Sequence, residues 1–169
     1  LSTKFEVTVY NRTVSKAEKW MSQYTGNLAM TPAEAAKNAD FVFSCVGNDD
    51  DLRSILLGID GAIDSMKKGT VFTDHTTCSA KVTKQMVAYS QKKGIGFVDA
   101  PVSGGQAGAE NGQLTIMCGG AQEHYDRIKP VISQYAKFSS LIGPSGSGQL
   151  TKMVNQICIA GLLQALSEG

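Results

Sequence analysis

The sequence lacks a charge excess of either sign. Its 169 residues carry 16 Lys and Arg against 15 Asp and Glu, which gives a formal net charge of +1. It has no basic stripe and no aromatic platform for stacked bases, the two features typical of nucleic-acid-binding proteins, and a near-neutral chain has no electrostatic attraction to an acidic membrane surface. No apolar run reaches the length of a membrane span, and the start does not have the pattern of a signal peptide. We therefore expect neither a nucleic-acid partner nor a membrane.

Cysteines are few and far apart. The four of them, Cys45, Cys78, Cys118 and Cys158, are separated by 33 to 40 residues. This spacing excludes a CxxC metal or redox motif and disfavours a disulfide framework. We expect no metal site, and reduced thiols in the cytoplasm. The mitochondrial matrix is the alternative for a eukaryotic source.

Short β-branched or aromatic runs alternate with helical runs along the whole chain. This alternation predicts βαβ units, and the run "FVFSCV" is apolar on both faces, as strands are when helices cover both sides of a sheet. We predict one α/β domain with a doubly wound, Rossmann-like, mostly parallel sheet that ends in the start of a long helix. The expected strands are Glu6–Tyr10, Phe41–Val46, Thr70–Asp74, Gly96–Asp99, Leu114–Cys118 and Phe138–Ile142. The expected helices are Val14–Tyr24, Pro32–Asn38, Asp49–Leu57, Ala80–Lys93, Ala121–Gln134 and Gly148–Glu168, with Thr31 and Ser79 as N-caps.

Both ends of the sequence look cut. The chain opens at Leu1 without an initiator Met, and it stops in "GLLQALSEG", inside the last helical run. The segment Ile157–Leu163 of that run is apolar all round, which is typical of a helix buried on every side. We expect its cover to come from a further segment or from a partner chain.

Polar residues follow the first predicted strand, and ligands of doubly wound sheets bind beyond the carboxyl ends of the strands. In "VTVYNRT", Asn11 holds the place at which dinucleotide folds usually carry a carboxylate for the ribose hydroxyls, and Arg12 and Thr13 follow it. A guanidinium and a hydroxyl suit a 2′-phosphate, which a carboxylate repels. The alternative interpretation is a solvated loop in which Asn11 or Thr13 caps the next helix.

Two more strand ends offer contacts to a cofactor. In "FSCVGNDD" the strand ends in Val46 and Gly47, where a glycine lets a cofactor lie flat on the backbone, although a helix N-cap in the next two residues explains the pattern equally well. In "FTDHTTCSA", Thr77 can offer a hydroxyl near a nicotinamide ribose. His75 has the chemistry of a base, but we interpret it as a bystander, because a lone histidine in a loop is more often one.

The stretch "FVDAPVSGGQAGAENGQLTIMCGG" holds six glycines. Either its turns need a positive φ, or its backbone must approach a ligand closely. Ser103, Gly104 and Gly105 present a hydroxyl and consecutive backbone N–H groups, which make an anion-binding concavity suited to a carboxylate. The alternative is a run of turn-forming glycines.

The last predicted helix carries Lys152, Asn155 and Gln156 at positions i, i+3 and i+4, on one face. A lysine at a mostly buried helix start can exchange protons, because desolvation lowers its pKa. The alternative is a surface lysine.

In combination, the blocks D-A-P-V-S-G-G and G-S-G-Q-L-T-K-M-V-N-Q resemble the β-hydroxyacid dehydrogenases, and the resemblance covers essentially the whole chain. That family includes 3-hydroxyisobutyrate dehydrogenase, tartronate semialdehyde reductase and the glyoxylate and succinic semialdehyde reductases. The resemblance implies an NAD(P)-dependent oxidoreductase that moves a hydride between the nicotinamide and a small β-hydroxyacid, semialdehyde or 2-oxo acid.

The resemblance also implies roles for single residues. Ser103, Gly104 and Gly105 would hold the carboxylate of the substrate, and Lys152 would be the catalytic acid and base. Asn155 and Gln156 would orient the substrate. Which amide touches it stays open, because many members carry Asn at the fourth residue after the lysine, where this sequence has Gln156, and Asn155 also matches many members. The residues that fall where the family lines its nicotinamide cofactor are Val46, Gly47 and Thr77.

The sequence departs from the family in two ways. It has no strand followed by G-x-G-x-x-G, the turn that admits the pyrophosphate at a helix N-terminus; "LSTKF" resembles the end of the helix that follows that turn. It also lacks the all-helical domain that completes the active site and the dimer in the family. We therefore expect residues 1–145 to be a dinucleotide-binding domain without its first strand and residues 146–169 to begin an interdomain helix. We expect a homo-oligomer formed through the missing domain, and no activity from this chain alone.

Asn11 and Arg12 predict NADP as the preferred cofactor, with NAD as the alternative. Two other hypotheses stay open. One is an enzyme like 6-phosphogluconate dehydrogenase, and the other is a catalytically inactive dehydrogenase-like module that serves in assembly. The presence of Lys152 disfavours the inactive module.

Overall fold

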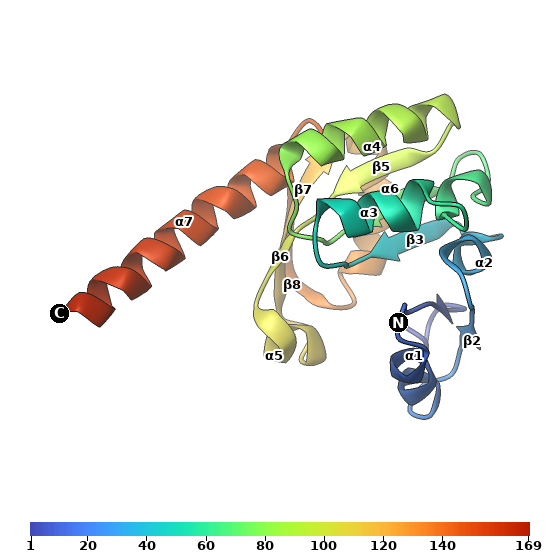
Figure 1. The fold of residues 1–169 in the computed structure, drawn as a ribbon, viewed down its shortest axis with the longest axis horizontal. Helices are drawn as coiled ribbons and strands as arrows, with labels where there is room; N and C mark the ends of the chain where they lie inside the picture. The colour runs from blue at the N-terminus through green and yellow to red at the C-terminus, as the bar shows by residue number, and fades with distance from the viewer.

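The computed structural model describes residues 1–169, and Figure 1 shows an α/β fold in which helices pack on a layer of strands. The strands of the main sheet are β3 (Phe41–Ser44), β4 (Val71–Asp74), β5 (Gly96–Asp99), β6 (Val102–Ser103), β7 (Leu114–Gly120) and β8 (Ala136–Gly143). They are ordered β3-β4-β5-β7-β6, with β8 also paired to β7. β3, β4 and β5 are parallel, β7 is antiparallel to β5 and β6, and β8 is parallel to β7. The predicted Rossmann-like, mostly parallel sheet is confirmed.

Alternate residues of the central strands enter two different cores. Phe72 and Phe97 stack on each other, with ring centroids 5.4 Å apart, in a core shared with helices α3 (Asp49–Leu57) and α4 (Ala80–Lys92). Their neighbours Val71 and Val98 lie in the second core, which α6 (Gln122–Ile132) covers. Helices therefore bury both faces of the sheet, which is the reason that these strands are apolar throughout.

The N-terminal lobe, residues 1–30, stands apart from the main sheet. In it β1 (Thr8–Val9) and β2 (Asn27–Leu28) form a separate parallel pair beside α1 (Val14–Met21), and α2 (Pro32–Ala36) connects the lobe to β3 (Figure 1). The sequence predicted a longer first strand in one common sheet. β1 is shorter because its ladder with β2 contains only the pairs Thr8–Asn27 and Val9–Leu28. β1 pairs only with β2 and β3 only with β4, so each keeps one edge without a partner strand.

Local signals placed most of the helix starts correctly. At the start of α2, the hydroxyl of Thr31 accepts a bond from the N–H of Glu34 at 3.1 Å, and at the start of α4 Ser79 accepts one from Val82 at 3.1 Å. The elements that were not predicted are short: β2, β6, the helix α5 (Gly105–Glu110) and the 3₁₀ turn η1 (Ala62–Asp64). Elements of this length show no periodicity in a sequence.

The last helix, α7 (Ser147–Glu168), is buried only at its start, at Gly148, Gln149 and Lys152. Figure 1 shows it extending away from the body toward the C-terminus. Its apolar side chains there are bare, with Ile157 71% and Leu163 60% exposed. None of the helices combines the length and the hydropathy that a membrane crossing requires.

Candidate functional site

The carboxyl ends of three parallel strands meet at one edge of the main sheet. Ser44 of β3 is in register with Asp74 of β4, and Asp74 is in register with Asp99 of β5. The predicted cofactor residues Val46 and Thr77 follow these ends directly. Parallel topology therefore brings segments from distant parts of the sequence to one place, where ligands of doubly wound sheets bind.

A buried carboxylate connects two of the predicted cofactor segments. Oδ1 of Asp74 accepts bonds from the hydroxyl of Ser44 at 2.7 Å and from the N–H of Thr76 at 3.1 Å. The hydroxyl of Thr76 in turn accepts from the N–H of Val46 at 3.0 Å. Burial raises the pKa of Asp74, and the bonds from Thr76 and Ser44 oppose this rise. The network ties the backbone of Val46 to Thr76, the residue before the exposed Thr77.

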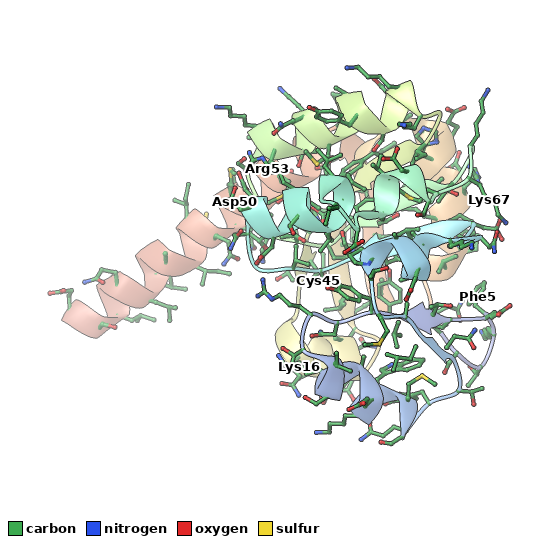
Figure 2. The ribbon with its side chains drawn as sticks, turned by 45° about the vertical axis from the view of Figure 1, so that its right-hand side comes forward. Phe5, Lys16, Cys45, Asp50, Arg53 and Lys67 are labelled. Carbon is green, nitrogen blue, oxygen red and sulfur yellow. The ribbon has the colours of Figure 1, made fainter.

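A cleft of about 1220 Å³ lies between the N-terminal lobe and the main sheet, and Asn11, Arg12, Thr13, Val46 and Gly47 all line it. Figure 2 shows Cys45, which also lines the cleft, at the boundary between the body and the lobe. The structure thus brings five of the six predicted cofactor residues to one cleft, with the sixth, Thr77, on the neighbouring loop.

Gly47 makes room in this cleft for the carboxylate of Asp51. A Cβ atom at Gly47 would lie 2.7 Å from Oδ2 of Asp51, a residue in the first turn of α3. The next residue, Asn48, caps α3 by accepting bonds from the N–H groups of Asp50 and Asp51 at 2.9 Å each. The helix N-cap that was the alternative explanation of this segment is therefore present. The backbone of Val46 and Gly47 still forms part of the cleft wall.

The residues expected at a 2′-phosphate have partners within the chain. Oδ1 of Asn11 accepts a bond from the N–H of Thr13 at 2.9 Å and so shapes the turn before α1, while the side chain of Thr13 caps nothing. Nη1 of Arg12 lies 2.9 Å from Oδ1 of Asp51, and the Arg12 side chain is 82% exposed. The guanidinium is accessible, but it is paired with an acid that the sequence did not point to.

Two separate structural requirements explain the glycines between Phe97 and Gly120 and at the start of α7. Gly104 and Gly105, which follow Ser103 of β6, have φ values of 131° and 59°, which L side chains rarely adopt. A Cβ at Gly119 would lie 2.6 Å from the carboxylate of Asp99, and one at Gly148 would contact the carbonyl oxygen of Met117. The first pair shapes the bend after Ser103, and the second pair lets the start of α7 lie directly against the sheet.

Asp99 anchors the N-terminus of α7. Its Oδ1 accepts from the N–H of Gly146 at 2.7 Å, and its Oδ2 accepts from the N–H of Gln149 at 3.1 Å. Burial raises the pKa of Asp99, while these backbone donors favour its charged form. A carboxylate at a helix N-terminus is also stabilised by the helix dipole. The position of α7 on the sheet therefore depends on this residue.

Lys152 lies one turn further along α7. The residue as a whole is buried, at 8% exposed, and it takes part in no ion pair of the structure. Burial lowers its pKa. Asn155 is half-buried on the same side of the helix and donates to Gln156, which is exposed, at 3.0 Å. Asn155 is thus the less exposed of the two amides on the helix face of Lys152.

His75 has both ring nitrogens occupied. Nδ1 lies 2.6 Å from the carbonyl oxygen of Ala100 and Nε2 lies 2.8 Å from the hydroxyl of Tyr135. A carbonyl oxygen only accepts, so Nδ1 carries the proton and Nε2 accepts from Tyr135. Burial lowers the pKa of His75. This neutral ring packs as part of the structure and has no free nitrogen for a base.

Sequence reasoning missed three polar residues of the site. Asp74 and Asp99 each end an apolar strand, in "VFTD" and "GFVD", and a carboxylate in that place was the available signal. Gln149 is 0% exposed and bonds the loop after β4, but a single glutamine at the start of a helix carries no signal of its own.

Comparison with known proteins identifies the family of the chain. Residues 1–154 match the family model for the NAD binding domain of 6-phosphogluconate dehydrogenase. An uncharacterized oxidoreductase of Shewanella frigidimarina is 58% identical over 164 residues, which are 97% of this chain and 56% of that protein. A probable mitochondrial 3-hydroxyisobutyrate dehydrogenase-like protein of Arabidopsis thaliana is 38% identical over 169 residues, or 100% of this chain and 56% of that protein.

The fold is also similar to that of solved structures. The 3-hydroxyisobutyrate dehydrogenase of Mycobacterium tuberculosis, in a structure with L-serine, superposes with a TM-score of 0.85 at 26% identity, over 92% of this chain and 53% of that one. The chain thus spans about half the length of the relatives that it matches. It belongs to the family of NAD-binding domains found in 6-phosphogluconate dehydrogenase and the β-hydroxyacid dehydrogenases.

Proposed function

We propose that the protein carrying this chain is an NAD(P)-dependent oxidoreductase for small hydroxyacids. It transfers a hydride between the nicotinamide and the carbonyl carbon of a semialdehyde or 2-oxo acid, and Lys152 gives or takes the proton at the carbonyl oxygen. Ser103, Gly104 and Gly105 bind the carboxylate of that substrate. The relatives named for 3-hydroxyisobutyrate dehydrogenase support this class of substrate.

The observation that carries the proposal is the environment of Lys152. A buried lysine without a carboxylate partner is costly, and structural lysines are rarely placed so. The cost is explained if the ammonium group works as an acid, because the lowered pKa eases loss of its proton. The same burial speaks against an inactive assembly module, which has no need of such a residue.

The chain's own residues divide the work between them. A nicotinamide held in the cleft would supply or accept the hydride. In the direction of reduction, Lys152 donates its proton to the carbonyl oxygen, and in the direction of oxidation it takes the proton of the hydroxyl group. The hydroxyl of Ser103 and the backbone after it hold the carboxylate, and the half-buried amide of Asn155 orients the oxygen beside Lys152.

The cleft beside β3 is the proposed place of the dinucleotide. Val46, Gly47 and Thr77 would line its nicotinamide half, and Arg12 and Thr13 would contact a 2′-phosphate, which makes NADP the preferred cofactor and NAD the alternative. The free edges of β1 and β3 both border this cleft. In the family pattern a further strand with its glycine-rich turn pairs there, and without it this chain alone is inactive.

We also propose where the whole protein is located and how its copies associate. The four cysteines are free thiols, which fits the cytoplasm, or the mitochondrial matrix for a eukaryotic source. Residues 146–169 start an interdomain helix, and the bare apolar residues of α7 fit a helical domain through which copies associate.

The test uses the full-length protein and follows cofactor oxidation with a panel of small semialdehydes and 2-oxo acids. Lys152→Ala should lower turnover by about 10²–10⁴-fold, the usual weight of general acid–base catalysis, with little change in cofactor affinity. Lys81→Ala, a matched change on the exposed side of α4, should leave turnover unchanged. Turnover of Lys152→Ala within a few-fold of the wild type would rule out this lysine as the proton donor.

A further inference from the structure

Gln149 binds the backbone on both sides of Thr77. Its Oε1 accepts from the N–H of Cys78 at 3.1 Å, and its Nε2 donates to the carbonyl of Thr76 at 2.6 Å. Gln149 is 0% exposed, so no water replaces either bond. The Gln149 amide thus bonds to one backbone N–H and one backbone carbonyl of the loop, as a neighbouring strand would, and so fixes the loop. Thr77 itself stays exposed.

The same residue is held from the other side by the sheet. Its backbone N–H donates to Asp99 at 3.1 Å, so Gln149 is tied at once to the end of β5 and to the loop after β4. Lys152 follows three residues later on the same helix face, about 4.5 Å further along the axis. No other side chain of α7 forms hydrogen bonds to the loop from Thr76 to Cys78.

We propose that Gln149 is a positioning residue, which sets the distance between Lys152 and the loop at Thr77 and so aligns proton transfer with hydride transfer. This inference rests on the proposed function. The physical reason is the steep dependence of such reactions on geometry, since a displacement of about 1 Å can cost about 10²-fold in rate. Gln149 touches neither of the reacting atoms in this scheme and acts through Lys152 and Thr77.

The test compares Gln149→Met with the wild type in the full-length protein. Methionine keeps the length and the burial of the side chain but loses both hydrogen bonds. We expect kcat to fall by about 10- to 100-fold, with the KM of the carbonyl substrate within about 3-fold. The primary isotope effect of deuterated cofactor on kcat should rise, because hydride transfer becomes slower than the other steps. Gln91→Met, at an exposed position of α4, is the matched control and should change none of these values.

A merely structural role of Gln149 predicts a different result. It would lower the folded fraction, and with it the maximal rate, but leave the isotope effect unchanged; that result would overturn the inference. So would an unchanged kcat in an active protein. If Gln149→Met does not fold, Gln149→Asn decides by the same measurements, because it keeps a neutral amide but is one methylene too short to hold both bonds. A wild type without turnover on any carbonyl substrate would remove the proposed function, and this inference with it.

Discussion

Arg12 and Asp51 form an ion pair of 2.9 Å that joins the N-terminal lobe to α3. The side chains are 82% and 25% exposed, respectively. Exposed pairs of this kind contribute about 0.2–1 kcal/mol, so a doubly charged phosphate can displace the carboxylate. The cation expected at a 2′-phosphate thus has a competitor within the chain, and the strength of that competition can be measured.

Asp51→Asn should raise the affinity of the full-length protein for NADP by about 2- to 5-fold, the factor that corresponds to the weight of one exposed ion pair. NAD carries no 2′-phosphate, so its affinity should stay the same. Asp50→Asn is the matched control, because Asp50 pairs with Arg53 at 2.7 Å and not with Arg12. Titration of both cofactors checks the prediction, and equal changes for NADP and NAD would contradict it.

The double change Asn11→Asp and Arg12→Gln should shift the preference from NADP toward NAD. The new carboxylate can accept bonds from ribose hydroxyls and repels a 2′-phosphate, while the guanidinium that pairs with the phosphate is lost. The ratio of the two catalytic efficiencies, before and after the change, is the measurement. The wild-type preference should also shrink as ionic strength rises, since the site is exposed. A wild type that already prefers NAD would show that Arg12 is only a loop residue.

Ser103→Ala should act mainly on substrate binding. Loss of one hydrogen bond to a charged carboxylate costs about 1.5–3 kcal/mol, so KM for an acid substrate should rise by about 10- to 150-fold. A neutral aldehyde without a carboxylate is the control substrate, and its KM should not change. Equal effects on both substrates would contradict a carboxylate contact of Ser103.

Asp74→Asn tests the buried carboxylate below the site. Burial raises the pKa of Asp74 in the folded state, so between its unfolded and folded pKa values the folded protein binds more protons, and the free energy of unfolding falls as pH rises. The amide oxygen of the introduced asparagine can keep the bonds from Ser44 and Thr76 without a charge. We expect the variant to be more stable than the wild type at neutral pH, with a difference that vanishes toward pH 3.8, the ordinary carboxyl pKa.

Urea unfolding across this pH range measures the difference. Asp126→Asn is the matched control, because this carboxylate of α6 is exposed and its one hydrogen bond is to Gln122. If Asp74→Asn were less stable at neutral pH, the hydrogen bonds of the charged form would outweigh its desolvation.

The 169-residue chain by itself should associate with itself through α7. Its apolar residues Ile157 and Leu163 are 71% and 60% exposed, and exposed apolar surface of this kind drives association. Analytical ultracentrifugation should show oligomers whose share rises with concentration. Lys in place of both residues should reduce them, and a monodisperse, monomeric wild-type chain would contradict the prediction.

Local patterns were enough to determine the longer helices and the central strands. Gly96–Asp99 and Asp49–Leu57 have the predicted bounds, because a run of buried residues between turn signals, or an Asn followed by three acids, marks them within a few residues of sequence. The apolar strands also predicted that helices cover both faces of the sheet. The resemblance added the roles of Ser103 and Lys152, and these roles remain proposals.

Only the tertiary structure decided which partners these residues have. Gln149 meets Thr76 across 73 positions and Arg12 meets Asp51 across 39, and no local pattern encodes a pair so far apart. β1 is another such case, since its length is set by its two-residue ladder with β2, which no local pattern encodes. The sequence determined which segments are apolar and where they turn, because both depend on nearest neighbours. The contacts that align the candidate site depend on how the segments pack, and packing exists only once the chain is folded.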